Sequence, residues 1–348
     1  MKTILIVTDA WYPQINGVVR SLEKLAQVIR DKGYNVEFLE PSSFLTVAMP
    51  TYKEIRLSLA IPSAVRNKII DINPDAIHIA TEGPLGAMAR HFCNKRKIPF
   101  STSFHTQYPE YIRARAPVPL RWTYAYFRRF HASAQYCLVS SKTVAEKLKQ
   151  RGFTNIVNWS LGVDLDIFNP RYKVENFFED NLSNKKITRP VFLFVGRVAV
   201  EKNIEAFLSL DLLGTKLIVG SGPQLEEMQK KYPDAVFVGS KNGEELSQYY
   251  ASADCFIFPS RTDTFGLVLL EAMASGVPVA AYPVQGPLDV IGEDCDAGVL
   301  DEDLQKAALE AVKIDRKLCR EYASKFTWQA SAEIFLDHLP FIQKEITS

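Results

Sequence analysis

Short apolar runs alternate with helical patterns along most of the chain, and this alternation constrains the fold more than any other feature. In the first half, apolar runs typical of buried strands lie at 2–8, 34–40, 76–80, 98–104 and 137–140. Segments with helical patterns follow at 18–32, 84–97 and 142–151, and the first ends at Gly33, a natural helix stop. Strands that alternate with helices predict βαβ units and a parallel sheet.

The alternation stops at 169–189, where Asn169-Pro170 is turn chemistry and 179–189 is polar without apolar periodicity. It restarts at 191–195 and continues to about 281, and the tail from 304 has helical patterns. The 348 residues therefore predict two doubly wound α/β domains at 1–168 and 190–327, joined by a linker at 169–189. A helix at about 328–348 is a candidate to pack back on the first domain. Ligands bind at the carboxyl ends of such strands, so we expect a cleft between two facing domains.

Composition and cysteine usage exclude several classes. With 47% hydrophobic and 23% charged residues, the chain is neither disordered nor fibrous. No apolar run reaches the ~18 residues of a spanning helix, and residues 1–8 suit a first strand better than a signal peptide. The five cysteines are scattered without a Cys-x-x-Cys pair, and no His-x-x-x-His spacing occurs. We expect a protein of the reducing cytoplasm without a structural metal.

The charge is divided unevenly between the halves. Residues 1–170 hold 22 Lys and Arg against 13 Asp and Glu, a net charge of +9, whereas 171–348 hold 19 against 27, a net charge of −8. A basic half predicts that one domain meets an anionic surface or substrate. Recognisable nucleic-acid-binding motifs are missing from that half, so a nucleic acid is not the expected partner.

Two loops of the second half carry features of a phosphate site. Gly196-Arg197 and Lys202-Asn203 lie between a strand and a helix, where two cations and exposed N–H groups suit a diphosphate. A plain strand-to-helix loop with solvated cations is the alternative. Gly220-Ser221-Gly222 has the same position after the next strand, but no Walker A lysine follows, and alone it is a weak signal.

A pair of carboxylates forms the strongest pattern. Asp263 lies at the end of a predicted strand, and Glu271 follows eight positions later, about two turns into an apolar helix. A carboxylate among such residues is costly to bury without a partner, and sugar or ribose hydroxyls are suitable partners. A partly exposed glutamate on a helix edge is the alternative.

Four motifs in order together resemble the GT4 family of retaining glycosyltransferases, which have the GT-B fold of two facing Rossmann-like domains. The motifs are Asp9 to Val19, which is similar to the family's first glycine loop; Ser103-Phe104-His105-Thr106-Gln107-Tyr108; Gly196 to Asn203; and Asp263-x7-Glu271 with Phe265-Gly266 inside it. The first acidic position of the last motif is usually Glu in the family and is Asp263 here, which bears on hexose identity.

The resemblance implies a role for each matched residue. Arg197 and Lys202 would hold the diphosphate and stabilise the leaving charge, so that no metal or other cofactor is required. Glu271 would bind the ribose, and Asp263 would bind the hexose. The donor-binding set also contains Gly17, Gly196, Gly220, Val238, Gly239, Phe265, Gly266 and Leu267.

His105 is implied to lie against the hexose, although a lone histidine after an apolar strand is often structural. Retention suggests a carboxylate nucleophile, as in retaining hydrolases. The sequence offers no clear candidate beside His105, so a front-face displacement, in which the leaving phosphate accepts the acceptor's proton, fits better.

The expected function is hexose transfer from a nucleotide-diphosphate sugar, with GDP-mannose favoured because 262–266 resembles bacterial α-mannosyltransferases and glycolipid glycosyltransferases. A UDP-glucose- or UDP-galactose-dependent glycolipid enzyme is the first alternative. A sugar-nucleotide epimerase or hydrolase of the same fold is the second. The third is a non-catalytic nucleotide-sugar-binding module, which would be expected to lose Lys202, Glu271 or His105.

The expected acceptor is a lipid or a glycan. A basic, aromatic segment at 113–130 can lie on an anionic membrane, which would place the protein at the inner face of the membrane. The alternative is a helix that packs its aromatic rings inward and exposes its arginines to water. The acceptor or membrane candidates are Tyr12, Tyr108, Arg113, Arg115, Arg121, Arg128 and Arg129.

Overall fold

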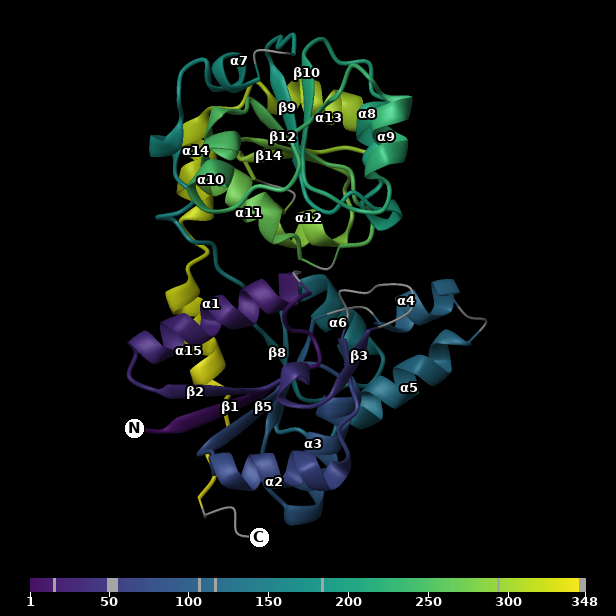
Figure 1. Ribbon diagram of the computed structural model, residues 1–348, viewed down its shortest axis with the longest axis vertical. Coiled ribbons are helices and arrows are strands. Elements are labelled where there is room, and N and C mark those ends of the chain that lie inside the picture. Colours follow the sequence, from purple (N-terminus) through teal and green to yellow (C-terminus); the bar gives the residue numbers. More distant parts are fainter. Residues whose placement is uncertain are drawn as a thin grey trace. The chain divides into compact units, whose positions relative to one another are not determined.

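The computed structural model describes residues 1–14, 17–48, 56–105, 108–115, 118–182, 185–263, 265–292 and 295–343. The chain forms two compact units, each built on its own six-stranded parallel sheet (Figure 1). The first unit contains Met1–Leu161 and Trp328–Ser348, and the second contains Gly162–Thr327. The predicted pair of doubly wound α/β sheets is therefore confirmed.

The sheet of the first unit has the strand order β2-β1-β5-β6-β7-β8, with a reversal between β1 and β5. A separate antiparallel pair, β3-β4, follows β2. The strands are β1 (Thr3–Val7), β2 (Asn35–Leu39), β3 (Thr46–Ala48), β4 (Arg56–Ser58), β5 (Ala76–Ile79), β6 (Ser101–Phe104), β7 (Tyr136–Val139) and β8 (Ile156–Asn158). The helices are α1 (Gly17–Asp31), η1 (Pro41–Ser43), α2 (Pro62–Ile72), α3 (Pro84–Arg96), α4 (Tyr108–Arg115), α5 (Leu120–His131), α6 (Lys142–Gln150) and α15 (Trp328–Asp337).

Helices cover both faces of this sheet. Figure 1 shows α2 and α3 on one side of β1 and β5, and α1 with α15 on the other. Leu5 and Val7 of β1 join a core with Ile69 of α2 and Leu85 of α3. Because side chains alternate along a strand, the neighbouring residues of β1 point to the opposite face, which explains why β1 is apolar from Ile4 to Val7.

The sheet of the second unit has the strand order β11-β10-β9-β12-β13-β14, with a reversal between β9 and β12. Its strands are β9 (Val191–Val195), β10 (Thr215–Val219), β11 (Val236–Phe237), β12 (Cys255–Phe258), β13 (Val279–Ala281) and β14 (Gly298–Leu300). Its helices are η2 (Pro170–Tyr172), α7 (Phe177–Asn181), η3 (Val200–Lys202), α8 (Ile204–Leu208), α9 (Leu225–Lys231), α10 (Gly243–Ser252), α11 (Leu267–Ala274), α12 (Gln285–Val290), α13 (Leu304–Ala311) and α14 (Arg316–Ala323).

Residues 169–189, predicted as a linker, lie within the second unit wherever the structure describes them. The aromatic rings of α7 give the physical reason. Phe177 and Phe178 are buried, and their ring centroids lie 5.1 and 5.8 Å from that of Tyr249 on α10. The division between the units falls instead at Leu161/Gly162 and at Thr327/Trp328.

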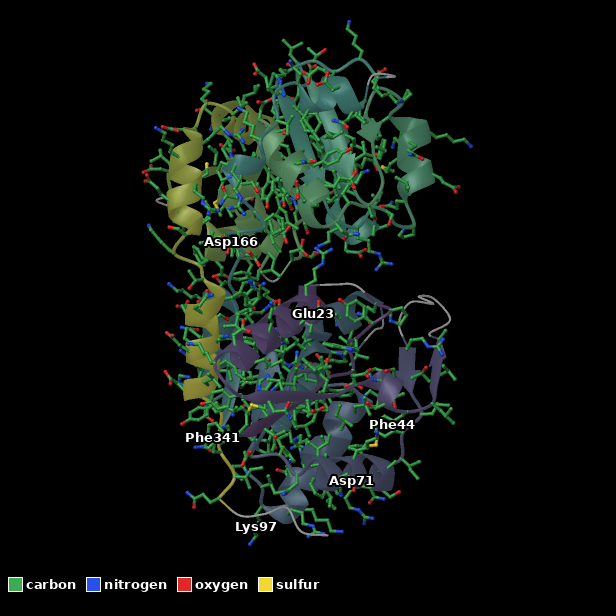
Figure 2. All side chains as sticks on the ribbon, turned by 60° about the vertical axis from the view of Figure 1, so that its left-hand side comes forward. Glu23, Phe44, Asp71, Lys97, Asp166 and Phe341 are labelled. Carbon is green, nitrogen blue, oxygen red and sulfur yellow. The ribbon has the colours of Figure 1, made fainter. Side chains whose placement is uncertain are left out.

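The C-terminal segment from Trp328 belongs to the first unit. Lys32 pairs with Glu333 of α15 at 3.0 Å, and α15 lies beside α1 (Figure 1). Beyond α15, Phe341, labelled in Figure 2, forms a bridge to Ala76 at the start of β5. In the described part of the chain, no helix is both long and apolar enough to cross a membrane.

Candidate active site

The predicted diphosphate and sugar residues gather at the strand reversal of the second sheet. Strands β9 and β12 are parallel, hydrogen-bonded neighbours. The strand that follows β9 in the chain, β10, lies on one side of this pair, and the strand that follows β12, β13, lies on the other. The loops after these two strands, 196–203 and 259–266, therefore lie side by side at their carboxyl ends. This switch point is where open α/β sheets bind their ligands.

Three successive loops at this edge pack backbone against backbone. Gly196 donates to Val219 O at 3.0 Å, and Gly220 donates to Gly239 O at 2.8 Å. A Cβ atom on Gly220 would lie 1.8 Å from Gly196 O, and the φ of Gly220 is +150°. Only glycine allows such an approach, so Gly220 sets the spacing of the predicted donor loops. Val238 joins the same edge by donating to Ile218 O at 3.1 Å.

The loop after β12 is held against η3. The amide of Asn203 donates to Pro259 O at 3.0 Å, and the hydroxyls of Ser260 and Thr262 each lie 3.2 Å from Glu201 O. These bonds bring the Lys202 ammonium to 2.5 Å from Oδ1 of Asp263. The pair is partly exposed, with 26% and 21% of the two side chains accessible. The second carboxylate oxygen, Oδ2 of Asp263, is buried and has no hydrogen-bond partner among the described residues.

Glu271 is the fifth residue of α11 and is buried; it lies about one turn into the helix rather than the predicted two, because the helix begins at Leu267 and not at Asp263. The hydroxyl of Tyr250, on α10, donates to its Oε2 at 2.8 Å. The carboxylate therefore has a protein partner that the sequence did not predict, because Tyr250 is 21 positions away. Since a buried carboxylate requires such a donor, Tyr250 both stabilises and orients Glu271.

The remaining donor candidates of this unit occupy the same edge. Arg197 directly follows Gly196 and is partly exposed. Phe265 is buried, and Gly266 precedes α11 with a φ of +85°, so that Leu267 is the first residue of the helix. Thr264, inside the acidic motif, lies outside the described residues. Metal-ligand geometry, with three or more His, Cys, Asp and Glu together, is not found among the residues that the structure describes.

In the first unit, His105 follows β6 and is partly buried. Its Nε2 is buried and accepts or donates no hydrogen bond within the described part of the chain. Burial lowers the pKa of His105 to about 4, so the imidazole is neutral at physiological pH. Its ring meets that of Trp159 edge to face, with centroids 5.7 Å apart. A neutral imidazole with an unpaired nitrogen is suited to bind a hydroxyl group.

The loop after β1 is anchored by Asp9, a residue whose role the sequence did not indicate. Its carboxylate accepts from the backbone N–H groups of Leu85 at 2.8 Å and Gly86 at 3.2 Å, at the first turn of α3. Thr81 completes the contact, donating to Oδ2 at 3.0 Å. Burial raises the pKa of Asp9, and the two backbone bonds oppose that shift. Asp9 thus joins the loop after β1 to the loop after β5 at the strand reversal of the first sheet.

A second unpredicted contact lies next to this one. Nε2 of His131, the last residue of α5, lies 3.2 Å from Oε1 of Glu82, and both side chains are buried. Burial opposes a charge on His131, but the neighbouring Cys137 and Glu82 raise its pKa to about 10. The imidazolium and the carboxylate form a buried ion pair that holds the loop after β5. Residues 49 positions apart make this contact, so no local pattern revealed it.

Gly17 is the first residue of α1, and a Cβ there would meet nothing within 4 Å. Its neighbours at 15–16 lie outside the described residues. The hydroxyl of Tyr12 donates to Glu23 at 2.9 Å, so this acceptor candidate lies beside the second turn of α1, at the residue that Figure 2 labels.

Helix α5 divides its aromatic residues between two faces. Tyr124, Phe127 and Phe130 are buried, whereas Trp122 and Tyr126 are 62% and 54% exposed. The exposed side of the segment also contains Arg113, Arg121, Arg128 and Arg129. The side chains of Tyr108 and Arg115 lie outside the described residues. The inward-packing alternative thus holds for three of the five aromatic residues and fails for two.

Known families match most of the chain in two parts. Residues 15–167 match the description "Glycosyltransferase Family 4", and residues 189–314 match "Glycosyl transferases group 1". The chain belongs to family 4 of the nucleotide-sugar glycosyltransferases. The four motifs noted in the sequence lie within or overlap these matches, so the expected family is confirmed.

The names of individual relatives of this glycosyltransferase specify different sugars. The sulfoquinovosyl transferase SQD2 of Arabidopsis thaliana is 34% identical over 81% of this chain, and the match spans 59% of that protein. The GDP-mannose-dependent α-mannosyltransferase of Corynebacterium glutamicum is 28% identical over 96% of this chain and 88% of its own length. The α-monoglucosyldiacylglycerol synthase of Streptococcus pneumoniae is 26% identical over 95% of this chain and 82% of its own length.

Solved structures support the fold. The sucrose-phosphate synthase of Thermosynechococcus elongatus has a TM-score of 0.75 at 19% identity and covers 97% of this chain and 98% of its own. Anabaena HepE, in complex with UDP-glucose, has a TM-score of 0.72 at 16% identity, covering 97% and 99%. The glycosyltransferase therefore has the GT-B fold that the motifs predict.

Proposed function

We propose that this glycosyltransferase moves a hexose, with retention of the anomeric configuration, from a nucleotide-diphosphate sugar to a lipid or glycan acceptor. One observation carries the proposal. Lys202 and Asp263 meet at the β9/β12 switch point, and Asp263 keeps a buried carboxylate oxygen that has no hydrogen-bond partner among the residues that the structure describes. Buried polar groups are almost always hydrogen-bonded, so this atom indicates a place for a ligand hydroxyl.

In this proposal the diphosphate binds the cations of the loop after β9. Arg197 and Lys202 would bind its oxygens and stabilise the charge that develops as the nucleoside diphosphate leaves. The Lys202 ammonium would then exchange part of its contact with Asp263 for a contact with phosphate. Backbone N–H groups near Gly17 would add donors from the first unit.

The sugar end of the donor would be held by hydrogen-bond acceptors and donors together. Oδ2 of Asp263 would accept from a hexose hydroxyl, and the backbone amides of 265–267, at the start of α11, would donate to others. Glu271, oriented by Tyr250, would accept from the ribose. His105 would place its Nε2 against the hexose. We expect the departing phosphate to accept the acceptor's proton in a front-face displacement, and a glycosyl adduct isolated on a side chain would contradict this step.

GDP-mannose is the favoured donor. The Corynebacterium relative that aligns with 96% of this chain is a GDP-mannose-dependent enzyme, and its match covers both units. A UDP-hexose is the runner-up. It is favoured by the monoglucosyldiacylglycerol synthase relative and by the HepE complex with UDP-glucose.

Thermal-shift binding distinguishes these donors. The panel contains GDP-mannose, UDP-glucose, UDP-galactose, UDP-N-acetylglucosamine, GDP and UDP, each with EDTA present. A ligand at 100 times its Kd should stabilise the native state by about 2.7 kcal/mol. We expect GDP-mannose to raise the Tm in the wild type and to lose most of this effect in Lys202→Met. Stabilisation by no nucleotide would favour a non-catalytic module, and donor loss without any acceptor would favour a hydrolase or epimerase.

The acceptor side of the proposal depends on α5. Trp122 and Tyr126 are exposed beside Arg121, a combination that suits an anionic membrane surface or a lipid headgroup. Flotation with anionic vesicles at low salt tests this. We expect wild-type protein to float and the double variant Trp122→Ser/Tyr126→Ser to remain largely in solution. Equal flotation of both proteins would show that α5 is not the docking surface.

A further inference from the structure

The C-terminal helix α15 holds a buried tryptophan of the first unit in place. Trp159 directly follows β8 and is 1% exposed. Its indole N–H donates to Ser331 O at 3.0 Å, and its ring centroid lies 5.8 Å from that of Phe335. Both partners belong to α15, so a helix about 170 positions away in the chain sets the position of this indole.

The other side of Trp159 contacts His105. The two rings meet at an interplanar angle of 62°, with centroids 5.7 Å apart. Because Nε2 of His105 has no hydrogen-bond partner in the described part of the chain, no bond at that atom fixes the imidazole. The packing against Trp159 is therefore a principal restraint on its orientation.

Helix α15 reaches His105 by a second route. Phe335 packs edge to face on His78, with centroids 4.8 Å apart. The two ring nitrogens of His78 bond the hydroxyls of Ser101 at 2.9 Å and Ser103 at 2.6 Å. Both serines lie on β6, the strand that ends one residue before His105. Phe335 thus packs against both the indole and the strand that place His105.

We propose that α15 is a positioning element of the transfer reaction, and that Trp159 is the positioning residue through which it orients and dehydrates His105. The proposal rests on the role of His105 in the proposed function. It goes beyond the family comparison, because the two matched regions end at residues 167 and 314 and do not include α15.

Burial explains how the contact would affect the chemistry. Burial lowers the pKa of His105 to about 4, and His78 is the titratable neighbour, with its own pKa lowered to about 3. A smaller residue at 159 would admit water to the imidazole, and a hydrated imidazole titrates near its ordinary value of about 6.5. The pKa of His105 therefore reports the contact directly, whether or not turnover is measured.

Two substitutions of Trp159 and one control test the proposal. Trp159→Phe keeps one aromatic ring and loses the indole N–H and the second ring, whereas Trp159→Leu loses aromatic contact with His105 altogether. Phe153→Leu removes another buried aromatic ring of the same unit, which packs 6.1 Å from His131 and not against His105. The readouts are kcat, the KM for the donor, the Tm, and the pKa of His105 by NMR, with its signal assigned from His105→Gln.

We expect Trp159→Leu to lower kcat by about 10-fold or more with a donor KM within about twofold, the pattern of lost positioning rather than lost binding. In the same variant the pKa of His105 should rise toward 6.5, and Trp159→Phe should restore most of both properties. Phe153→Leu should lower the Tm to a similar extent with kcat unchanged.

Two results would overturn the proposal: an unchanged His105 pKa in Trp159→Leu, or an equal loss of kcat in Phe153→Leu at the same Tm. Failure of the underlying function has a different signature. If His105→Ala transfers sugar at the wild-type rate, the role of His105 in the proposed function is wrong, even where the NMR titration shows the Trp159 contact.

Discussion

Replacing Asp263 by alanine should separate function from stability. The substitution removes the ion pair with Lys202, in which each side chain is roughly a quarter exposed or somewhat less, at 26% for Lys202 and 21% for Asp263. Pairs accessible to water are worth only ~0.2–1 kcal/mol. The substitution also removes the buried Oδ2, which has no hydrogen-bond partner within the described ranges of the chain, and a buried unsatisfied polar group costs about 1–3 kcal/mol. The unfolding free energy should therefore fall by no more than ~1 kcal/mol and could rise by ~2 kcal/mol.

Activity, in contrast to stability, should fall sharply. Without the carboxylate, the hexose loses a charged hydrogen-bond acceptor, and we expect kcat/KM to fall by at least about 100-fold, or ~2.7 kcal/mol of transition-state stabilisation. Asp263→Glu, which restores the residue usual in the family, should recover part of this loss. Differential scanning fluorimetry and a nucleotide-release assay measure the two effects on the same samples.

Asp254 supplies a matched control at the other end of β12. Its carboxylate accepts from Val191 N at 2.7 Å and from Nη1 of Arg189 at 3.0 Å, so it satisfies a buried backbone donor. Asp254→Ala should cost on the order of 2–4 kcal/mol of stability, while the protein that remains folded keeps its activity. A loss of 3 kcal/mol or more in Asp263→Ala, with activity retained, would refute the reasoning and make Asp263 a structural residue.

Gly220→Ala should disrupt the donor loops, because the added Cβ would lie 1.8 Å from Gly196 O, whereas Gly33→Ala, outside the donor-binding set, meets nothing within 4 Å and adds only the strain of a φ of +88°. We expect the first variant to lose nucleotide binding by calorimetry and the second to keep it; equal affinities would contradict the loop packing. Burial lowers the pKa of His105 to about 4. The pKa of His78 is lowered to about 3, mainly by burial and further by repulsion from a charge on His105. Because the unfolded chain binds these protons below about pH 6.5 and the native state does not, stability should fall as the pH falls from 6.5, by on the order of 2–5 kcal/mol at pH 4.5. Urea unfolding of the wild type and of His105→Gln should show a smaller decrease in the variant, and parallel curves would contradict the shift.

The sequence predicted the parts of this protein that depend on local pattern. The buried strands β1 and β9 and the amphipathic helix α1 are continuous signals, and the glycine after β9 marked the end of that strand, where the structure has a loop leading to η3. Short elements left weaker signals. The three-residue edge strands β8 and β14 are only partly buried, and α7 is a single helical turn inside a polar segment, so these were not predicted.

The site contacts that sequence reasoning missed share one physical property. Asp9 with Leu85, Glu82 with His131, and Tyr250 with Glu271 are separated by 76, 49 and 21 positions, respectively. Each is a hydrogen bond that exists only once the fold has brought separate helices and loops together. Residue type indicated that Glu271 needed a partner, but only the fold shows that Tyr250 supplies it.

The most direct test of the central claim is transfer of labelled mannose from GDP-mannose to an extractable lipid by the purified protein, in the presence of anionic phospholipid and EDTA. The account predicts label in the organic phase with the wild type, and a loss of about 100-fold in Asp263→Ala while that variant remains folded. If neither GDP-mannose nor any UDP-hexose is consumed by the folded wild-type protein with a mixed lipid extract, hexose transfer from the β9/β12 site is contradicted.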